Sequence, residues 1–475
     1  MNITAKNGIA LSLLSTALVG YAQEAKQPNV IFLLVDDMGW RDLGCFGSDF
    51  YQSPHIDKLA QDGVLFDNAY ATCTVSSPTR ASIMTGKYPA KLHLTDWIEG
   101  HKKPKAKLQV PDWTMYLPLN EITMAEVFKS NGYATGHFGK WHLGEDTKYW
   151  PENQGFDVNV GGWSNGSPNK NEKKGFNGYF TPYGNPRLTD GPLGEQLTER
   201  LSSEVCNYIE NNKTKPFFIN LWFYNVHTPL QAKAEKIAKY KALADTTKQH
   251  TNPVYAAMVE HVDDAVGEVV RKLKELQLYD NTIIVFTSDN GGLIGRGTNK
   301  VTNNLPIRSG KGDIYEGGVR VPLICKLPKS KNASTINHNQ VISVDYLPTF
   351  IELAHLSVSD SLKKSMDGIS IAQNLNNKKK IKRKAIYWHY PHYHTEGATP
   401  YSAVREGDWK LINVLETNTF ELYNLKSDIG ESIELSTKYP KKTNKLKKDL
   451  QDWRNKIGAQ MPTDNPNYEP VRTDK

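Results

Sequence analysis

The chain has 475 residues and a formal net charge of +7, from 58 lysines and arginines against 51 aspartates and glutamates. Its residues are 39% hydrophobic, its mean hydropathy is −0.55, and no apolar run approaches the roughly 20 residues of a membrane helix. These values exclude an integral membrane segment and indicate a soluble globular protein with a large core. The basic excess is mild: it suits an anionic ligand without requiring one, and we expect no nucleic-acid partner.

The first 22 residues have the pattern of a secretory signal peptide. One positive charge at Lys6 precedes the short apolar stretch 9–19, and a Gly-Tyr-Ala sequence ending at Ala22 supplies small residues for cleavage. We therefore expect cleavage near Ala22 and export, either to the periplasm or out of the cell. A buried N-terminal helix is the alternative interpretation, and the polar residues 23–27 argue against it.

The four cysteines are far apart in the sequence and lack the spacing of metal ligands. Export would permit disulfides, but a domain of this size does not need them. We expect most of the cysteines to be small buried apolar residues, and we leave a Cys45–Cys73 disulfide open.

Three apolar runs have the character of strands that are buried on both faces, as in parallel sheets. They cover Asn29–Val35, Phe217–Phe223 and Thr282–Phe286. A helix is expected at Tyr255–Leu276, where apolar residues recur at helical spacing. Strands that alternate with helices predict one large α/β domain.

Polar residues follow two of these strands: Asp36 and Asp37 follow the first, and Asp289 and Asn290 follow the third. Catalytic groups gather beyond the carboxyl ends of such strands. Crowded carboxylates repel one another, and a divalent cation is a simple way to hold them together. Oxygen ligands without cysteine or histidine favour calcium or magnesium. Helix capping is the alternative role for these residues.

The composition changes near residue 376. The run 376–384 is polar and basic, which indicates a solvated loop, with polyanion binding as the alternative. Short strand-like pieces follow at Ala385–Trp388, Trp409–Val414 and Phe420–Leu425, and Pro440–Ile457 is a basic amphipathic stretch. This pattern predicts a small antiparallel sheet with one helix packed on it.

The most specific motif is Ser76-Ser77-Pro78-Thr79-Arg80, followed after four residues by Thr-Gly. It resembles the signature of the formylglycine-dependent sulfatases of the alkaline phosphatase superfamily. Serine at the modified position makes the chain similar to serine-type bacterial carbohydrate sulfatases. In those enzymes a radical iron–sulfur maturase oxidises this side chain to formylglycine (3-oxoalanine), so the resemblance implies such a partner and marks Ser76 as the modified residue.

Further motifs of that family follow in order, so the resemblance covers nearly the whole chain after the signal peptide. The family fold that it implies has a large mixed central sheet flanked by helices and a small C-terminal antiparallel subdomain. We expect a signal peptide at 1–22, a catalytic sulfatase domain at 23–375 and a C-terminal subdomain at 376–475 that completes the substrate pocket. The matching segments are Pro28–Gly39, Gly139–Gly144, His227–Pro229, Ser288–Gly292, Gly310–Pro322, Asp345–Thr349 and Glu421–Leu425.

The resemblance also implies a metal site and a nucleophile. A calcium ion, with magnesium as the alternative, would be held by Asp36, Asp37, Asp289, Asn290 and residue 76. Hydrated formylglycine carries two hydroxyls on one carbon, and one of them would attack the sulfur of a sulfate ester.

Five more residues receive roles from the same resemblance. Lys140 and Lys311 would hold sulfate and aldehyde oxygens, and Arg80 would hold the formylglycine. His227 would protonate the departing sugar oxygen, and His142 would take the proton from the second hydroxyl.

The substrate expected from this reading is a sulfated polysaccharide or oligosaccharide, from algae (ulvan or carrageenan) or from host glycosaminoglycans. Candidate sugar-binding residues are Asp96 and Trp97, after the nucleophile motif, and His389 and His392, in the C-terminal subdomain. Core packing is the alternative role for the two histidines. Two other functions stay open: a phosphodiester or phosphonate hydrolase of the same superfamily, and a non-catalytic glycan-binding relative.

Overall fold

The computed structural model describes residues 27–168, 170–171, 176–297, 299–328, 333–377 and 380–470. The expected signal peptide, 1–22, lies outside these described residues, and so do residues 378 and 379 of the basic run. Within the described part, no helix has both the length and the apolar character that crossing a membrane would require.

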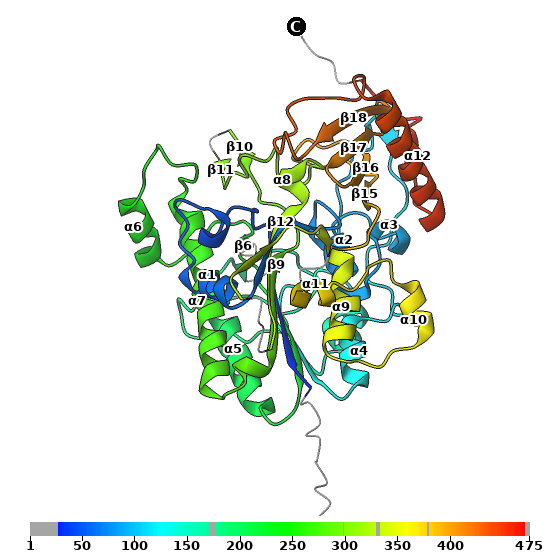
Figure 1. Cartoon of the computed structure of the whole chain (residues 1–475). Helices are drawn as coiled ribbons and strands as arrows, with labels where there is room; N and C mark the ends of the chain where they lie inside the picture. Colours follow the sequence, from blue (N-terminus) through cyan, green and yellow to red (C-terminus); the bar gives the residue numbers. More distant parts are fainter. Residues whose placement is uncertain are drawn as a thin grey trace, which may run out of the picture.

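A mixed sheet forms the centre of the protein (Figure 1). The strands β9, β1, β8, β4 and β5 run parallel to one another, whereas β12 is antiparallel to both β9 and β2. With the short β14, which pairs with β2, the described residues contribute nine strands to this sheet. Their order is β13 (Thr335–Asn337), β2 (Val64–Tyr70), β12 (Arg320–Lys326), β9 (Thr282–Ser288), β1 (Asn29–Val35), β8 (Phe217–Trp222), β4 (Ala134–Gly139) and β5 (Val158–Val160), with β14 at Val341–Ile342.

The central strand β1 shows why its apolar run is continuous. All seven residues are buried, and successive side chains enter opposite faces of the sheet. Ile31 and Leu33 pack into one hydrophobic cluster, while Phe32 and Leu34 pack into the other. Each such side chain contributes about 1.5–3 kcal/mol by leaving water. A polar substitution at any of them would therefore disrupt one of the two cores.

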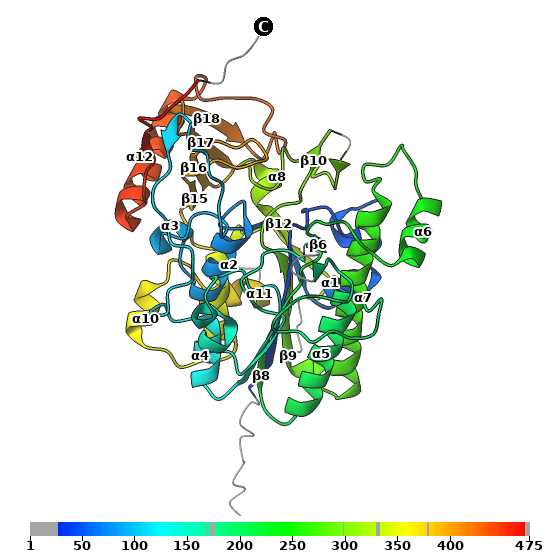
Figure 2. The same cartoon turned by 180° about the vertical axis from the view of Figure 1, so that it is seen from behind.

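Helices cover both faces of the sheet, as Figures 1 and 2 show from opposite sides. On one face lie α1 (Pro54–Asp62), α5 (Leu197–Asn212), α6 (Ala234–Ala242) and α7 (Pro253–Glu275). The other face carries α2 (Ser76–Thr85), α4 (Met124–Ser130), α9 (Tyr346–Leu353), α10 (Asp360–Ser365) and α11 (Ala372–Asn377). The predicted α/β class with a mixed central sheet is confirmed.

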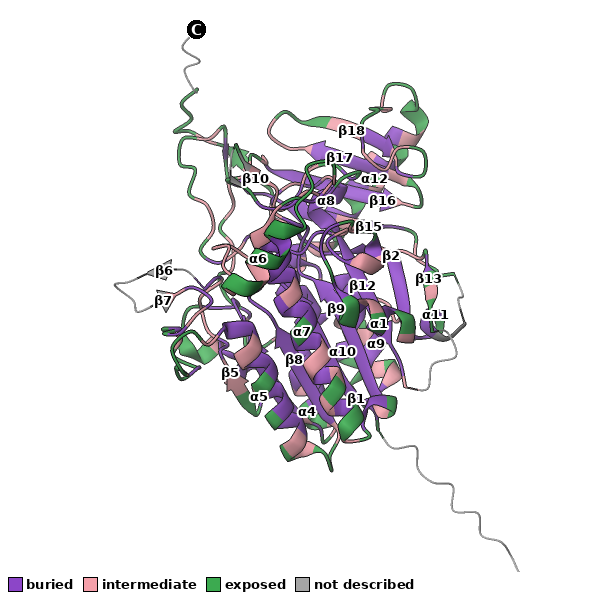
Figure 3. Cartoon of the chain, turned by 90° about the vertical axis from the view of Figure 1, so that its left-hand side faces the viewer, coloured by how far each residue is buried: buried purple, intermediate pink, exposed green. Residues whose placement is uncertain are grey.

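The C-terminal part forms a second, antiparallel sheet with one helix against it (Figure 3). Its strands, in order, are β15 (Ile386–Tyr390), β16 (Tyr401–Glu406), β17 (Trp409–Val414) and β18 (Thr419–Asn424), and its helix is α12 (Pro440–Ile457). The helix has the bounds predicted from the sequence and buries Leu446, Leu450 and Trp453. This sheet lies at the end of the molecule toward which the strand β1 runs (Figure 1).

Helix α7 begins two residues before the predicted position, because Asn252 caps it. The Asn252 side chain accepts hydrogen bonds from the backbone N–H groups of Val254 and Tyr255, and Pro253 occupies the first helical position. The remaining short α-helices are α3 (Pro89–Leu92) and α8 (Glu316–Val319). The remaining strands form two-stranded pairs: β3 (Leu108–Gln109) with β19 (Thr463–Asp464), β6 (Lys170–Asn171) with β7 (Phe176–Asn177), and β10 (Gly295–Arg296) with β11 (Asn299–Lys300).

All four cysteines are free thiols, so the disulfide left open between Cys45 and Cys73 is not formed. Cys45 packs against the cluster on the α7 side of the sheet. Cys73 belongs to a third cluster, which joins α3 and the C-terminal sheet. The two thiols therefore lie in different cores.

Candidate active site

Three carboxylates meet at the carboxyl ends of β1 and β9. Because these strands are parallel neighbours with Val35 opposite Ser288, the residues that follow them leave the same edge of the sheet. Single carboxylate oxygens of Asp36, Asp37 and Asp289 all lie within 4.8 Å of one another, and all three residues are buried. The backbone N–H of Asp37 donates to Asp289 Oδ1 at 3.2 Å, which ties the two loops together.

The three carboxylates differ in their ease of ionisation. Burial raises the pKa of Asp36 to about 7; Lys140 opposes this effect, and repulsion from Asp289 and Asp37 adds to it. Burial would also raise the pKa of Asp37, but Lys311 and His227 hold it below its usual range. For Asp289 the effect of burial is outweighed by Arg80, which keeps its pKa low.

The fourth oxygen of this group belongs to Asn290. Its Nδ2 donates to Asp37 Oδ1 at 2.8 Å and to the Gly291 carbonyl at 3.0 Å. Its Oδ1 is buried and has no hydrogen-bond partner among the described residues. A buried acceptor without a partner costs about 1–3 kcal/mol. Three clustered carboxylates and one orphaned amide oxygen form an all-oxygen donor set that fits a hard divalent cation, calcium or magnesium.

Ser76 lies directly beside these carboxylates, as the first residue of α2. Its Oγ donates to Asp36 Oδ1 at 3.2 Å and accepts from Lys140 Nζ at 3.1 Å. Lys140, which follows β4, also binds Asp36 Oδ2 at 2.7 Å. The start of a helix presents backbone N–H groups and a partial positive charge, so an oxygen anion at this position is stabilised.

Arg80 joins the two halves of the site from one turn along α2. Its Nε and Nη2 lie 2.9 and 2.8 Å from Asp289 Oδ2, and its Nη1 donates to the Lys140 carbonyl at 3.0 Å. The guanidinium is fully buried. Lys311, from the loop before α8, binds Asp37 Oδ2 at 2.7 Å. The cations of Arg80, Lys140 and Lys311 balance the three carboxylates, so a bound dication would leave the site positively charged.

Two histidines flank Ser76 in different hydrogen-bonding states. His142 Nε2 contacts the Ile98 carbonyl, an acceptor, so this nitrogen carries the proton of the neutral ring. Its Nδ1 is buried without a partner among the described residues and keeps its lone pair. Burial and Lys140 lower the pKa of His142 well below its usual value. A neutral ring with a free lone pair at Nδ1 is suited to accept a proton.

His227, which follows β8, has the opposite arrangement. Its Nδ1 donates to the Thr228 carbonyl at 2.7 Å, and its Nε2 lies 3.7 Å from Asp37 Oδ2. Burial and Lys311 lower the pKa of His227 to about 3. In the neutral ring Nε2 carries no hydrogen, so His227 can donate from Nε2 only after this atom has taken up a proton. A nearby anion favours the protonated ring.

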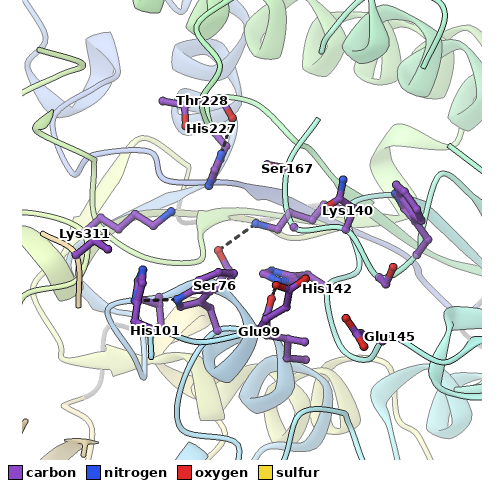
Figure 4. Close-up of a pocket in the computed structure, with 18 of the residues that line it drawn as sticks. Ser76, Glu99, His101, Lys140, His142, Glu145, Ser167, His227, Thr228 and Lys311 are labelled. Atoms are coloured by element: carbon purple, nitrogen blue, oxygen red, sulfur yellow. Dashed lines mark hydrogen bonds between the residues drawn. The ribbon is translucent and has the colours of Figure 1, made fainter. Parts of the chain in front are cut away.

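These groups open into one cavity of about 870 Å³, which Figure 4 shows in close-up. In that view Lys140 and Lys311 extend toward Ser76 from opposite sides. The predicted residues Ser76, Lys140, His142, His227, Lys311 and Trp97 all line the cavity. Asp36, Asp37, Arg80, Asp289 and Asn290 are buried in contact with Ser76, Lys140 or Lys311, or with one another, and do not line the cavity.

Three residues predicted to bind substrate are not brought into the cavity. Asp96 is buried and accepts from the Tyr390 hydroxyl at 2.8 Å. His389 has both ring nitrogens bonded, to Ser402 Oγ and the Gln460 carbonyl. His392 Nε2 lies 2.8 Å from Thr95 Oγ1. Each of these polar groups is therefore paired inside the protein.

Other polar and aromatic side chains line the cavity but received no individual role from the sequence. His101 and His394 lie close in the sequence to the predicted sugar contacts Trp97 and His392, and the enrichment of residues 93–101 and 388–394 in histidine and aromatic residues is a usable signal. Glu99 and Glu145 are exposed loop residues that no local pattern distinguishes from ordinary solvated carboxylates. The polar and aromatic residues of this kind include Glu99, His101, Glu145, Trp163, Asn165, His394 and Glu396.

Comparisons with family models, curated sequences and solved structures identify proteins that are similar to this chain. The family model "Sulfatase" matches residues 28–356, and the model "N-sulphoglucosamine sulphohydrolase, C-terminal" matches residues 310–456. A sulfatase of Formosa agariphila is 32% identical, over 91% of this chain and 89% of its own length. N-acetylgalactosamine-6-sulfatase of Homo sapiens is 28% identical, over 78% of this chain and 70% of its own length. The crystal structure of Ps i-CgsB in complex with k-i-k-neocarrahexaose has a TM-score of 0.76 and 29% identity, over 93% of this chain and 95% of that one.

Proposed function

The chain belongs to the sulfatase family of sulfuric ester hydrolases, and we propose that it removes sulfate from a sulfated oligosaccharide or polysaccharide. The observation that carries the proposal is the position of Ser76. Its Oγ bonds both Lys140 and Asp36, beside three clustered carboxylates and at the floor of a ligand-sized cavity. This arrangement supports Ser76 as the origin of the nucleophile, beside a proposed cation site and fixed positive charge.

Two groups complete this chemistry. Asp36, Asp37, Asp289 and Asn290, together with residue 76, would hold calcium, or alternatively magnesium. We propose that a serine-type radical maturase converts Ser76 to formylglycine during biosynthesis. When both are present, the cation supplies polarisation of the sulfate group and the hydrated aldehyde supplies the hydroxyl that attacks sulfur.

The lysines bind the anionic group and fix its orientation. Lys140 and Lys311 lie on either side of residue 76, where their ammonium groups can hold sulfate oxygens (Figure 4). Arg80 holds Asp289 and the Lys140 backbone, and it fixes the frame around residue 76. Because these charges are already oriented, they stabilise the negative charge that develops on the sulfuryl oxygens without reorganisation.

The two histidines move protons at defined atoms. His142 would accept a proton at Nδ1 from the second hydroxyl of a hydrated formylglycine at position 76, while its Nε2 stays bonded to the Ile98 carbonyl. His227 gives a proton from Nε2 to the departing sugar oxygen, once the negative charge of the bound ester has favoured its protonation. Splitting these roles between two rings allows each to act in its suitable state.

For the substrate we propose a sulfated algal galactan of the carrageenan type, with ulvan and host glycosaminoglycans as the alternatives. The relative solved with a neocarrahexaose aligns over nearly the whole chain. Trp97 and Trp163 line the cavity and offer apolar faces for a sugar ring. We further propose export to the periplasm or the medium, where such polymers are met.

We also propose that the C-terminal subdomain, 376–475, completes the substrate pocket of a catalytic domain at 23–375. His394, Thr395 and Glu396 line the cavity opposite loops of the N-terminal part, which supports this division.

The test is sulfate release from defined oligosaccharides, measured by ion chromatography. Protein is made with and without the serine-type maturase, and Ser76→Ala is the matched control. We expect release only from the maturase-treated wild type, with calcium present. Release by Ser76→Ala at the wild-type rate would contradict the proposal. Hydrolysis of phosphodiesters or phosphonate monoesters by unmodified protein, measured as release of the alcohol and without sulfate release from the oligosaccharides, would favour the phosphoesterase alternative. Glycan binding by maturase-treated protein without hydrolysis of either class of ester would favour the non-catalytic alternative.

A further inference from the structure

His101 is paired with Trp97 at the wall of the cavity. The indole Nε1–H of Trp97 donates to His101 Nδ1 at 3.1 Å, and the two rings meet edge to face with centroids 5.1 Å apart. Both residues line the cavity that contains Ser76, and both are half-buried. Figure 4 shows His101 on the Lys311 side of Ser76.

This pairing fixes the position of the proton on His101. An indole N–H can only donate, so His101 Nδ1 must accept and cannot carry a hydrogen. Burial, Lys103 and Lys311 lower the pKa of His101, so the ring is neutral near neutral pH. A neutral imidazole has one N–H, and here that hydrogen is on Nε2. The ring is therefore a defined, uncharged hydrogen-bond donor.

The C-terminal sheet holds the Trp97–His101 pair in place through Asp96. The Asp96 carboxylate accepts from the Tyr390 hydroxyl at 2.8 Å and from the Trp97 backbone at 2.9 Å. Burial raises the pKa of Asp96, and a backbone hydrogen bond from His101 lowers it and so favours the ionised carboxylate. Both Asp96 and Tyr390 are buried, so this connection is shielded from water. Asp96 is thus a positioning residue for the loop that carries the pair.

A second contact places His101 close to the sulfate-binding lysine. The ring of His101 meets that of His394 at 90°, with centroids 4.8 Å apart. His394 in turn packs against Gly312, where an added Cβ would lie 2.1 Å from His394 Nδ1. Gly312 directly follows Lys311, so the two histidines lie beside the group that binds the anion. A donor there faces the part of the substrate next to the sulfate.

We propose that His101 is a specificity-determining residue, which donates a hydrogen bond from Nε2 to an uncharged oxygen of the sugar that carries the sulfate. The inference rests on the proposed function. A hydroxyl, ring or ether oxygen suits a neutral donor, whereas the sulfate already has Lys140 and Lys311. A site built to bind such an oxygen discriminates against analogues that lack it, because its donor is then left unpaired. Aryl sulfates are such analogues.

The test compares kcat/KM for a sulfated oligosaccharide with kcat/KM for 4-methylumbelliferyl sulfate, in maturase-treated protein with calcium. For His101→Ala we expect the sugar-to-aryl ratio to fall roughly 3- to 10-fold, mainly through KM for the sugar. His101→Gln retains an N–H near the position of Nε2 and should restore most of the ratio. Trp97→Phe keeps an aromatic ring but frees the His101 tautomer, so the ratio should also fall.

The control is His93→Ala, in the same loop but outside the cavity, where His93 Nε2 contacts the Gly458 carbonyl. It should keep the wild-type ratio. An unchanged ratio in His101→Ala, or equal losses on both substrates, would overturn the inference while leaving the sulfatase proposal intact. Failure of aldehyde-bearing wild type to release sulfate from either substrate would overturn the proposed function and the inference with it.

Discussion

Calcium binding should weaken as the pH falls below about 7, because a proton and the cation compete for Asp36. Its pKa is raised to about 7 in the metal-free site, whereas the pKa values of Asp37 and Asp289 lie below their usual range. The pKa of His227 is about 3, so this ring stays neutral between pH 5.5 and 7.5. Asp36 is then the carboxylate of the site that titrates in this window.

The magnitude follows from the ionised fraction of Asp36. With a pKa near 7, about three-quarters of the groups are ionised at pH 7.5 and about 3% at pH 5.5. The calcium affinity should therefore fall about 20-fold between these two values, which is about 2 kcal/mol of binding free energy. Because the pKa in the folded state exceeds the unfolded value of 3.8, this group destabilises the metal-free fold as the pH rises toward 7.

Isothermal titration calorimetry of chelator-treated, unmodified protein measures this dependence directly. Asp36→Asn is the matched control, because it removes the competing proton and should bind calcium more weakly but with little pH dependence. Equal wild-type affinity at both pH values would refute the reasoning. So would an Asp36→Asn variant that keeps the full pH slope.

Three further predictions concern the frame of the site and the predicted sugar contacts. Arg80→Lys should remain folded, as judged by circular dichroism, but its kcat/KM should fall at least about 100-fold. Lysine cannot reproduce the two contacts to Asp289 and the contact to the Lys140 carbonyl. Near wild-type activity would contradict this prediction. Lys311→Met should raise KM for the sulfated substrate at least about 10-fold, since a cation close to the anion is lost; an unchanged KM would argue against the role of Lys311. His389→Ala should lower the free energy of unfolding, measured by urea titration, by about 2 kcal/mol, because both ring nitrogens are hydrogen-bonded in the core. KM for the sulfated substrate should change less than twofold. A large rise in KM would instead support the sugar-binding role predicted from the sequence.

The strand-end residues could be placed from the sequence because one physical pattern determines them. An apolar run long enough for a buried strand, ending abruptly in acidic residues, positions these residues at the edge of a parallel sheet. Asp36 and Asp289 meet because β1 and β9 pair in register, a consequence of the α/β pattern that the sequence already indicated. Helix α12 was also predictable, since its apolar spacing is local.

The residues that line the cavity could not be predicted in the same way, because contacts between residues far apart in the sequence determine their positions. The partners of His389 are Ser402 and the Gln460 carbonyl, which is 71 residues away in the chain. No local sequence pattern indicates these hydrogen-bond partners. A buried structural histidine therefore cannot be distinguished from a sugar-binding histidine by sequence. The same limit applies to Glu99 and Glu145, which reach the cavity only through the paths of their loops.

The most direct test of the account is mass spectrometry of the tryptic peptide 59–80 from protein made with the serine-type maturase. The account predicts a peptide lighter than the unmodified one by two hydrogen atoms, with fragment ions that assign the change to Ser76 rather than Ser77, and trapping by a hydrazine. Fully active sulfatase in which Ser76 is unmodified serine would contradict the central claim.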